Sequence, residues 1–289
     1  MNKKTKLKDR INHSVAGWCF TGDGKMTLDE LCQNAKRLGA KSVELVSPAD
    51  FPVLEKHGLI CAIGLPVAIK DKEPPFVRGW NDRANHEALI AKVGENIKSL
   101  GDAGFPATVV FTGYGRKFDG SETSPTEPLG DEIGVAEGIK TCVVGLKKLV
   151  SLAEQKKVVV CLEHLNTRDN THPMKGHPGY WGNDLAVCAE IVTYVNSPWV
   201  RLLFDIYHVQ VMHGDVIRRI RQCAALLGHV HTAGCPGRGE LDPNAQEISY
   251  PAVMRALVDV GYKGFVGHEF IPTGDAKKGL AQAIKLCDV

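Results

Sequence analysis

Residues 158–164 read VVVCLEH, five consecutive apolar residues followed by Glu163 and His164. Residues 107–113 (ATVVFTG) and 200–205 (VRLLFD) have a similar, largely continuous apolar character. Continuous apolar runs of this length are typical of strands buried on both faces, because a solvent-exposed face would introduce alternating polar residues. These three segments therefore predict a parallel β-sheet.

Eight such runs occur along the chain, and helical patterns alternate with them. The predicted strands are residues 11–20, 41–46, 59–66, 107–113, 158–164, 200–205, 228–234 and 264–270. The predicted helices are residues 27–39, 49–57, 86–103, 131–155, 183–196, 215–227, 251–260 and 275–287. This alternation predicts the α/β class and a closed (β/α)8 TIM barrel. We expect one domain over residues 1–289, with residues 1–10 forming a flexible tail.

An open, doubly wound sheet that binds a dinucleotide is the alternative architecture. Such a sheet carries GxGxxG directly after its first strand. The glycines in that region, Gly17, Gly22 and Gly24, do not follow this order. Gly113 and Gly115 follow a later run, but neither a third glycine nor a helix start comes after them. We interpret all five as loop glycines, so the closed barrel is preferred.

The composition is that of an ordinary globular protein. Of 289 residues, 44% are hydrophobic and 24% are charged, and 35 Lys and Arg against 33 Asp and Glu give a net charge of +2. These values argue against disorder and give no global reason to expect a nucleic acid partner. No stretch approaches the roughly 20 apolar residues of a membrane span. We therefore expect neither nucleic acid nor membrane as a partner.

The cysteines and the start of the chain both favour the cytoplasm. Nine cysteines occur, an odd number, and no CxxC pair is present. We expect them to be reduced and buried rather than disulfide-bonded or bound to zinc. The first residues, MNKKTKLKDRINHS, are basic but lack the apolar segment of a secretory signal.

Four long connections, residues 67–85, 114–130, 165–182 and 235–250, all run from a predicted strand to a predicted helix. In a (β/α)8 barrel these loops lie on the C-terminal face, where active sites are built. Long loops within a compact domain are usually functional. The sequence thus indicates which face of the barrel is catalytic.

Four consecutive predicted strands deliver a potential metal ligand at their C-terminal ends. These residues are Glu163, Asp205, His231 and Glu269. Singly, each is more typical of a helix N-cap or a hydrogen-bonded core residue. Together, three carboxylates would repel one another unless a cation lay among them. Three carboxylates and one imidazole suit a divalent ion such as Mn²⁺, Mg²⁺ or Co²⁺.

The same residues are suited to proton transfer. Glu163 and Glu269 come from separate strands, so they can flank a substrate and remove and return a proton. A metal ion would polarise the adjacent carbonyl and stabilise an enediolate. His208 and Arg238 are candidates for binding a substrate oxygen, although a locally packed histidine and a solvent-exposed loop arginine are the alternatives. Trp18 is predicted either to form an apolar wall of the substrate pocket or to pack in the core.

At these residues the chain resembles the xylose isomerase-like sugar isomerase and epimerase barrels, and within them the hydroxypyruvate isomerase group. The matching blocks are LEHLNTRD (162–169), FDIYHVQVMHGD (204–215), GHVHTAGCPGRGELD (228–242) and GHEF (267–270). The resemblance implies that Glu163, Asp205, His231 and Glu269 hold the metal and that Glu163 and Glu269 are the acid and base. It also implies that His208 and Arg238 hold the reacting oxygens, and Asn166 of the first block is a further substrate-binding candidate.

The activity implied by the resemblance is metal-dependent isomerisation, with hydroxypyruvate to tartronate semialdehyde as the leading reaction. A ketose 3-epimerase of the tagatose and psicose type is the nearest alternative, because His231 occupies a position that is often Gln in the hydroxypyruvate isomerase group. An endonuclease-IV-like phosphodiesterase and a non-catalytic sugar-binding barrel represent other classes. The expected partner is a small sugar or hydroxy-keto acid. The sequence does not decide whether the protein forms a homo-oligomer.

Three further residues have a simpler interpretation. We expect Glu44 to be structural and to hold a loop. We expect His172 and His177, in a segment that the related chains lack, to be loop residues in solvent, with further residues of the pocket as the alternative.

Overall fold

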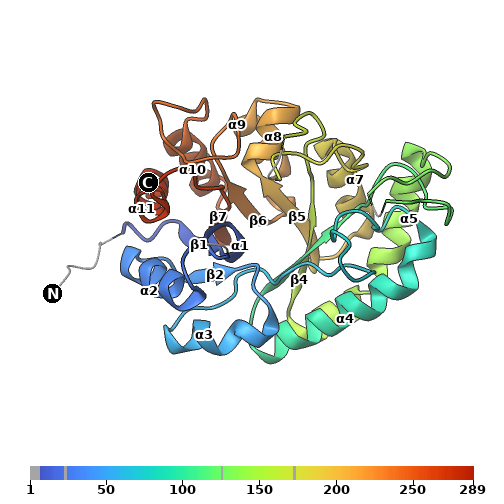
Figure 1. Ribbon diagram of the computed structural model, residues 1–289, viewed down its shortest axis with the longest axis horizontal. Coiled ribbons are helices and arrows are strands. Elements are labelled where there is room, and N and C mark those ends of the chain that lie inside the picture. Colours follow the sequence, from blue (N-terminus) through green and yellow to red (C-terminus); the bar gives the residue numbers. More distant parts are fainter. Residues whose placement is uncertain (1–6, 23–24, 125, 172–173) are drawn as a thin grey trace. The chain divides into compact units, whose positions relative to one another are not determined.

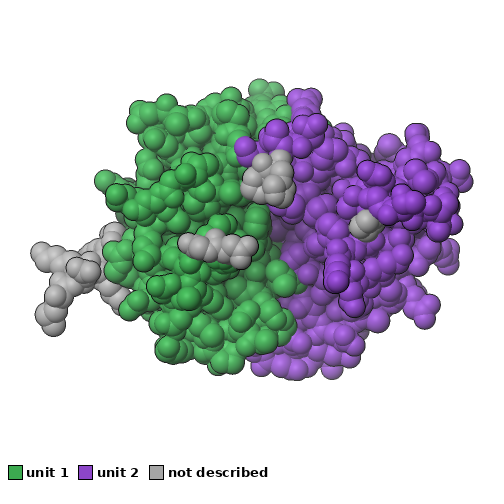
Figure 2. Space-filling view, viewed as in Figure 1, with its two compact units in different colours: residues 1–65, 205–289 green, residues 66–204 purple. Residues whose placement is uncertain are grey.

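Seven of the eight predicted strands form in the computed structural model, which describes residues 7–22, 25–124, 126–171 and 174–289 (Figure 1). The chain divides into two compact units. One consists of residues 1–65 and 205–289 and the other of residues 66–204 (Figure 2). Each unit carries its own set of parallel strands.

Unit 1 carries four parallel strands in the order β2-β1-β7-β6. Its elements in chain order are β1 (Asn12–Ala16), α1 (Gly17–Phe20), α2 (Leu28–Leu38), β2 (Ser42–Glu44), the 3-10 helix η1 (Pro48–Asp50), α3 (Phe51–Lys56), α8 (Ile206–Met212), α9 (Val216–Cys223), η3 (Ala224–Leu226), β6 (Leu227–Thr232), α10 (Tyr250–Asp259), β7 (Phe265–His268) and α11 (Ala276–Cys287). Helices α2 and α11 pack beside each other (Figure 1).

Unit 2 carries parallel strands in the order β3-β4-β5. Its elements are η2 (Arg83–Asn85), α4 (His86–Asp102), β3 (Ala107–Phe111), α5 (Val135–Lys147), α6 (Val150–Lys156), β4 (Val159–Glu163), α7 (Leu185–Val195) and β5 (Val200–Asp205), whose last residue begins the second segment of unit 1. All five residues of β3 and the last four of β5 are buried. The continuous apolar runs therefore form buried strands, as predicted.

The predicted strand at residues 59–66 is replaced by an irregular segment. It lies along β2, where the N–H groups of Val43 and Leu45 donate to its carbonyls at 3.1 and 2.9 Å. The Ala62 N–H donates instead to the Ser42 hydroxyl, at 2.9 Å. A side-chain oxygen thus replaces a backbone carbonyl as the acceptor of one hydrogen bond between the two segments. Leu45 has a left-handed backbone (φ 55°), which ends β2 after Glu44.

Two other boundaries differ from prediction. The first strand ends at Ala16, because the Gly17 carbonyl accepts hydrogen bonds from both the N–H and the hydroxyl of Thr21 at 3.0 Å and closes a helical turn. The predicted helix at 131–155 is two helices, α5 and α6. Between them, the N–H groups of Lys148 and Leu149 bond three residues back rather than four, which tightens the turn.

The structure also bears on the predictions about the cysteines, membrane-spanning segments and the N-terminal tail. All nine cysteines are buried and none forms a disulfide, as expected. No helix among the described residues combines the length and apolar character needed to cross a membrane. Residues 1–6 of the predicted tail lie outside the described residues. Beyond them, the Lys8 N–H donates to the Asp288 carboxylate at 2.9 Å and Asp9 pairs with Lys41 at 2.6 Å.

Helix α2 has the N-terminal cap that its sequence predicts. The Thr27 hydroxyl accepts the Glu30 N–H at 3.2 Å, and the Glu30 carboxylate accepts the Thr27 N–H at 2.8 Å. Gly39 ends the helix with a left-handed backbone (φ 92°), which glycine adopts at little cost.

Replacement of this cap should destabilise the protein measurably. We expect Thr27→Ala to lower the free energy of unfolding by about 1 kcal/mol, because it leaves the Glu30 N–H without its side-chain acceptor. Urea unfolding followed by circular dichroism measures the change. Thr193→Ala is the matched control, because that exposed hydroxyl donates only within its own helix, to the Ala189 carbonyl. An equal loss in both variants would contradict a specific role for the cap.

Candidate active site

Asp205, His231 and Glu269 form a buried cluster in unit 1. Each offers one potential ligand atom, and these atoms lie within 4.8 Å of one another. Asp205 is the last residue of β5, His231 lies near the end of β6, and Glu269 directly follows β7. The Glu269 N–H donates to the Thr232 carbonyl at 3.0 Å, which continues the sheet and fixes where this carboxylate emerges. The three predicted ligands of unit 1 are therefore brought together.

Asp205 also caps helix α8. Its Oδ1 accepts the N–H groups of Tyr207 at 2.7 Å and His208 at 3.2 Å. Its Oδ2 is buried and has no hydrogen-bond partner among the described residues. His208, fully buried in the first turn of α8, has its Nε2 3.6 Å from this oxygen. One oxygen of Asp205 thus organises the helix, while the other faces the cluster.

Glu269 is surrounded by donors. The Arg238 guanidinium lies 2.6 Å from its Oε2, His231 Nδ1 lies 3.1 Å from the same oxygen, and the Trp18 indole N–H donates to Oε1 at 2.9 Å. Burial opposes ionisation of Glu269, but the charges of His231 and Arg238 and these hydrogen bonds outweigh it and hold its pKa well below the usual range. Burial raises the pKa of Asp205, although Arg238 opposes the shift. The environment therefore shifts the pKa values of the two carboxyl groups in opposite directions.

Trp18 and Arg238 are thus both located at the cluster. Trp18 lies on α1, not at a strand end, and points its polar edge at Glu269. Arg238 is 3% exposed, which excludes the solvent-exposed loop arginine that the sequence left open. Its backbone is left-handed (φ 56°), in the loop that follows β6.

Glu163 and Asn166 belong to unit 2. Glu163 is buried at the end of β4 and lies opposite Leu203 of β5 in the parallel register. The Tyr180 hydroxyl donates to the Glu163 carbonyl at 2.8 Å and so fixes the end of the strand. The Asn166 amide donates to the Lys175 carbonyl at 2.8 Å and accepts the Asp169 N–H at 3.2 Å. Asn166 therefore braces the loop after β4.

That loop contains one residue whose environment was predicted wrongly. His177 is 4% exposed, and its ring packs edge-on against Phe76 with centroids 4.4 Å apart. The backbone N–H of His177 donates to the Asn166 carbonyl at 2.8 Å. The loop folds back on itself, so His177 is an internal residue of it and not a solvated one. His172 lies outside the described residues.

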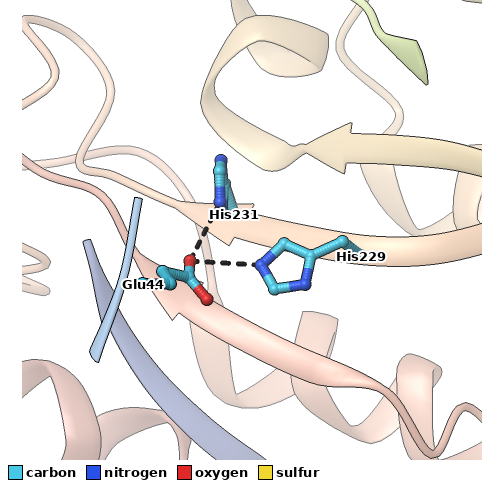
Figure 3. A group of neighbouring side chains, drawn as sticks. All are labelled: Glu44, His229 and His231. Atoms are coloured by element: carbon cyan, nitrogen blue, oxygen red, sulfur yellow. Dashed lines mark hydrogen bonds and ion pairs between the residues drawn. The ribbon is translucent and has the colours of Figure 1, made fainter. Parts of the chain in front are cut away.

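Glu44 was expected to hold a loop, but its carboxylate pairs with two histidines of β6. Its Oε1 lies 3.1 Å from His229 Nε2 and 3.0 Å from His231 Nε2, and all three side chains are buried (Figure 3). Burial alone would raise the pKa of Glu44, but the two imidazoles outweigh it and lower the pKa to about 2. The alternation His229-Val230-His231, with both imidazoles on one face of β6, was the available signal.

A second buried polar group lies along β1 and β7. His13 Nδ1 is 3.2 Å from His268 Nε2, and His268 Nδ1 is 3.0 Å from the Thr232 hydroxyl. Burial lowers the pKa of His13 to about 4 and that of His268 well below its usual value. Both rings are therefore neutral at pH 7, and they support the strand that carries Glu269.

A family model described as xylose isomerase-like TIM barrel matches residues 32–288. The chain belongs to the xylose isomerase-like TIM barrel family. This membership confirms the (β/α)8 barrel predicted from the strand–helix alternation. Among solved structures, AP endonuclease, family 2, from Brucella melitensis shares the fold with a TM-score of 0.75 and 23% identity, over 94% of this chain and 98% of that chain.

Curated relatives match over a shorter region. 2-Oxo-tetronate isomerase of Cupriavidus necator is 32% identical over 144 residues, which cover 48% of this chain and 50% of that protein. Hydroxypyruvate isomerase of Escherichia coli is 26% identical over 140 residues, which cover 48% and 51%. The chain thus spans about half the length of the curated relatives it matches.

The buried histidine pair predicts a pH dependence of stability. Because the folded pKa of His13 is about 4 and the unfolded value is 6.5, the unfolded chain takes up a proton in this range that the folded protein does not. Stability should therefore fall as the pH decreases from 6.5 to 4. We expect His13→Asn, whose amide can still hydrogen-bond to His268, to show a shallower fall in urea unfolding.

Ser14→Ala is the control for this experiment, because it removes a buried polar group from the same strand without removing a titratable one. It should change the stability without changing its slope with pH. A His13→Asn variant with the full wild-type slope would show that His13 does not contribute to the pH dependence.

Proposed function

We propose that this protein is a metal-dependent isomerase that moves a proton between adjacent carbons of a small hydroxy-carbonyl compound. The observation that carries the proposal is the buried cluster of Asp205, His231 and Glu269 with Arg238 beside it. Relatives named hydroxypyruvate isomerase and 2-oxo-tetronate isomerase support the same reaction class. Both names describe isomerases of small hydroxylated oxo acids.

The donor set fits a divalent cation. Its atoms are carboxylate oxygens and an imidazole nitrogen, with no thiolate, which suits Mn²⁺, Mg²⁺ or Co²⁺. Asp205 Oδ2 is buried without a hydrogen bond from the described residues, as expected of an oxygen that serves as a ligand. Asp205, His231 and Glu269 would hold the ion through these atoms.

We propose Glu163 as the fourth ligand. In the parallel pairing of β4 with β5, Glu163 lies opposite Leu203, two residues before Asp205. The C-terminal ends of the strands of a TIM barrel surround one active site. Glu163 therefore lies at the C-terminal end of a neighbouring strand. Its burial is consistent with a role as ligand rather than as a solvated carboxylate.

Glu163 and Glu269 are proposed as the acid and base. In the conversion of hydroxypyruvate to tartronate semialdehyde, a proton leaves the hydroxymethyl carbon, a proton is added to the neighbouring carbonyl carbon, and the hydroxyl proton moves between the two oxygens. A bound divalent ion would polarise the carbonyl and make the departing proton more acidic. Glu269 is held ionised by Arg238 and His231, so it is in the form that accepts a proton.

The remaining residues would orient the substrate. Arg238 has the planar fork that binds a carboxylate through two parallel hydrogen bonds, which suits an oxo acid. His208 would donate to a substrate oxygen, and Trp18 would form a wall of the pocket beside Glu269. Asn166 is proposed as a further binding residue, because its loop follows β4 at the C-terminal end of that strand. The cytoplasmic location expected from the sequence stays a prediction.

A ketose 3-epimerase is the second candidate. The presence of His231 among the ligands favours it, since the sequence resemblance associates this residue with ketose epimerases. The same two carboxylates would then act on opposite faces of one carbon. The substrate, and not the ligand set, distinguishes the two activities.

Solvent deuterium incorporation followed by NMR tests the proposed function. We expect the enzyme with added Mn²⁺ to exchange the proton next to the carbonyl of hydroxypyruvate, and chelation to abolish the exchange. Glu163→Gln and Glu269→Gln should each slow it by at least about a hundredfold, because an amide cannot accept the proton. Glu95→Gln, on the exposed face of α4, is the control and should retain full exchange.

A panel of ketoses in the same experiment separates the candidates. Exchange at C3 of a ketose, without exchange of hydroxypyruvate, would favour the epimerase. If the metal binds but no compound exchanges, the isomerase proposal is wrong, and a phosphodiesterase or a sugar-binding barrel becomes the better interpretation.

A further inference from the structure

Glu44 connects two imidazoles through one oxygen atom. His229 and His231 are two residues apart on β6, so both rings lie on the same face of the strand. They meet at 86° with centroids 4.9 Å apart, and each directs its Nε2 to Glu44 Oε1 (Figure 3). Neither ring can turn without breaking its bond to this carboxylate.

The position of Glu44 depends on a missing side chain in β7. A Cβ atom on Gly267 would collide with Glu44 Oε1 and would lie 2.9 Å from His231 Cδ2. The carboxylate and the imidazole thus pack directly against the backbone of β7, two residues before Glu269. This close approach leaves Glu44 little freedom.

The two nitrogens of His231 consequently face different partners. Nε2 is 3.0 Å from Glu44, whereas Nδ1 is 3.1 Å from Glu269 Oε2, inside the cluster of proposed ligands. A neutral imidazole has one N–H and one lone pair. Nδ1 is ion-paired with Glu269 when the ring carries both hydrogens. On metal binding the Nδ1 proton would leave, Nε2 would keep the hydrogen that bonds to Glu44, and the lone pair of Nδ1 would point toward the metal position.

We propose that Glu44 is a positioning residue that holds His231 with Nδ1 available as the metal ligand. The inference rests on the proposed function. Carboxylates that accept the second N–H of a metal-binding histidine orient the ring and increase its basicity, and their loss weakens metal binding by about ten- to a hundredfold. Glu44 would thus act on the metal through His231, without contacting it.

Glu44, His229 and His231 could also be interpreted as a second metal site, since their ligand atoms lie within 4.8 Å of one another. In that case His231 would bind one ion through Nδ1 and another through Nε2. Its ring would then have to lose both protons, which a hydrogen bond to Glu44 does not require. We therefore favour a hydrogen-bonded brace and one ion per chain.

Calorimetric titration of metal-stripped protein with Mn²⁺ alone tests the inference. We expect one ion per wild-type chain and about ten- to a hundredfold weaker binding to Glu44→Ala. Glu44→Gln should recover part of the affinity, because its amide oxygen still accepts the His231 N–H. His229→Leu is the matched control, since it removes the other partner of Glu44, and its affinity should stay within about threefold of wild type.

Two further readouts separate positioning from folding. Thermal melting of the metal-free variants reports whether each one folds. The visible absorption spectrum of bound Co²⁺ reports its ligand geometry, and we expect it to change in Glu44→Ala but not in His229→Leu. If Glu44→Ala does not fold, the affinity and spectrum of Glu44→Gln decide, and wild-type values for both would overturn the inference.

The outcomes distinguish this inference from the function on which it rests. Wild-type affinity and spectrum in a folded Glu44→Ala, or two Mn²⁺ ions per wild-type chain, would overturn the role of Glu44 and leave the isomerase proposal standing. A wild-type protein that binds neither Mn²⁺ nor Co²⁺ would overturn both.

Discussion

Carboxyl groups buried close together require positive charge, and this constraint organises unit 1. Asp205 and Glu269 lie in one cluster where burial disfavours their ionised forms. Arg238 and His231 supply the compensating charge, and they lower the pKa of Glu269 strongly while only opposing the rise at Asp205. The loop after β6 therefore has to bury an arginine, which is otherwise rare. A divalent ion would meet the same electrostatic requirement and would use the same donor atoms.

The strands beneath the cluster are specialised to hold its side chains. Glu44 from β2 braces His231 on β6, and Gly267 on β7 leaves the space for that contact. The hydrogen bonds from His13 through His268 to Thr232 join β1, β7 and β6 just before Glu269. His231 and the strand that precedes Glu269 are thus each supported by side chains of neighbouring strands, which accounts for several of the buried polar groups in this unit.

Much of this arrangement is predictable from the sequence. The continuous apolar runs predicted the buried strands, and the strand ends predicted the residues of the cluster, because side chains at equivalent ends of parallel strands lie near one another. Glu44 was predicted to hold a loop, because its true partners lie more than 180 residues away and only the sheet brings them together. The segment at 59–66 has the composition of a strand, but a serine hydroxyl takes one ladder position beside it. Its irregularity therefore depends on a side-chain contact that no local pattern contains.

The central claim is that the buried carboxylates and imidazole hold one divalent ion. Anomalous diffraction at the manganese edge, from crystals grown with Mn²⁺, tests it most directly. We expect one strong peak, bounded by the side chains of Asp205, His231 and Glu269 and by the carboxylate of Glu163, with Nδ1 of His231 as the nitrogen ligand. A peak between Glu44 and His229, or no peak in crystals of protein that catalyses proton exchange, would contradict it.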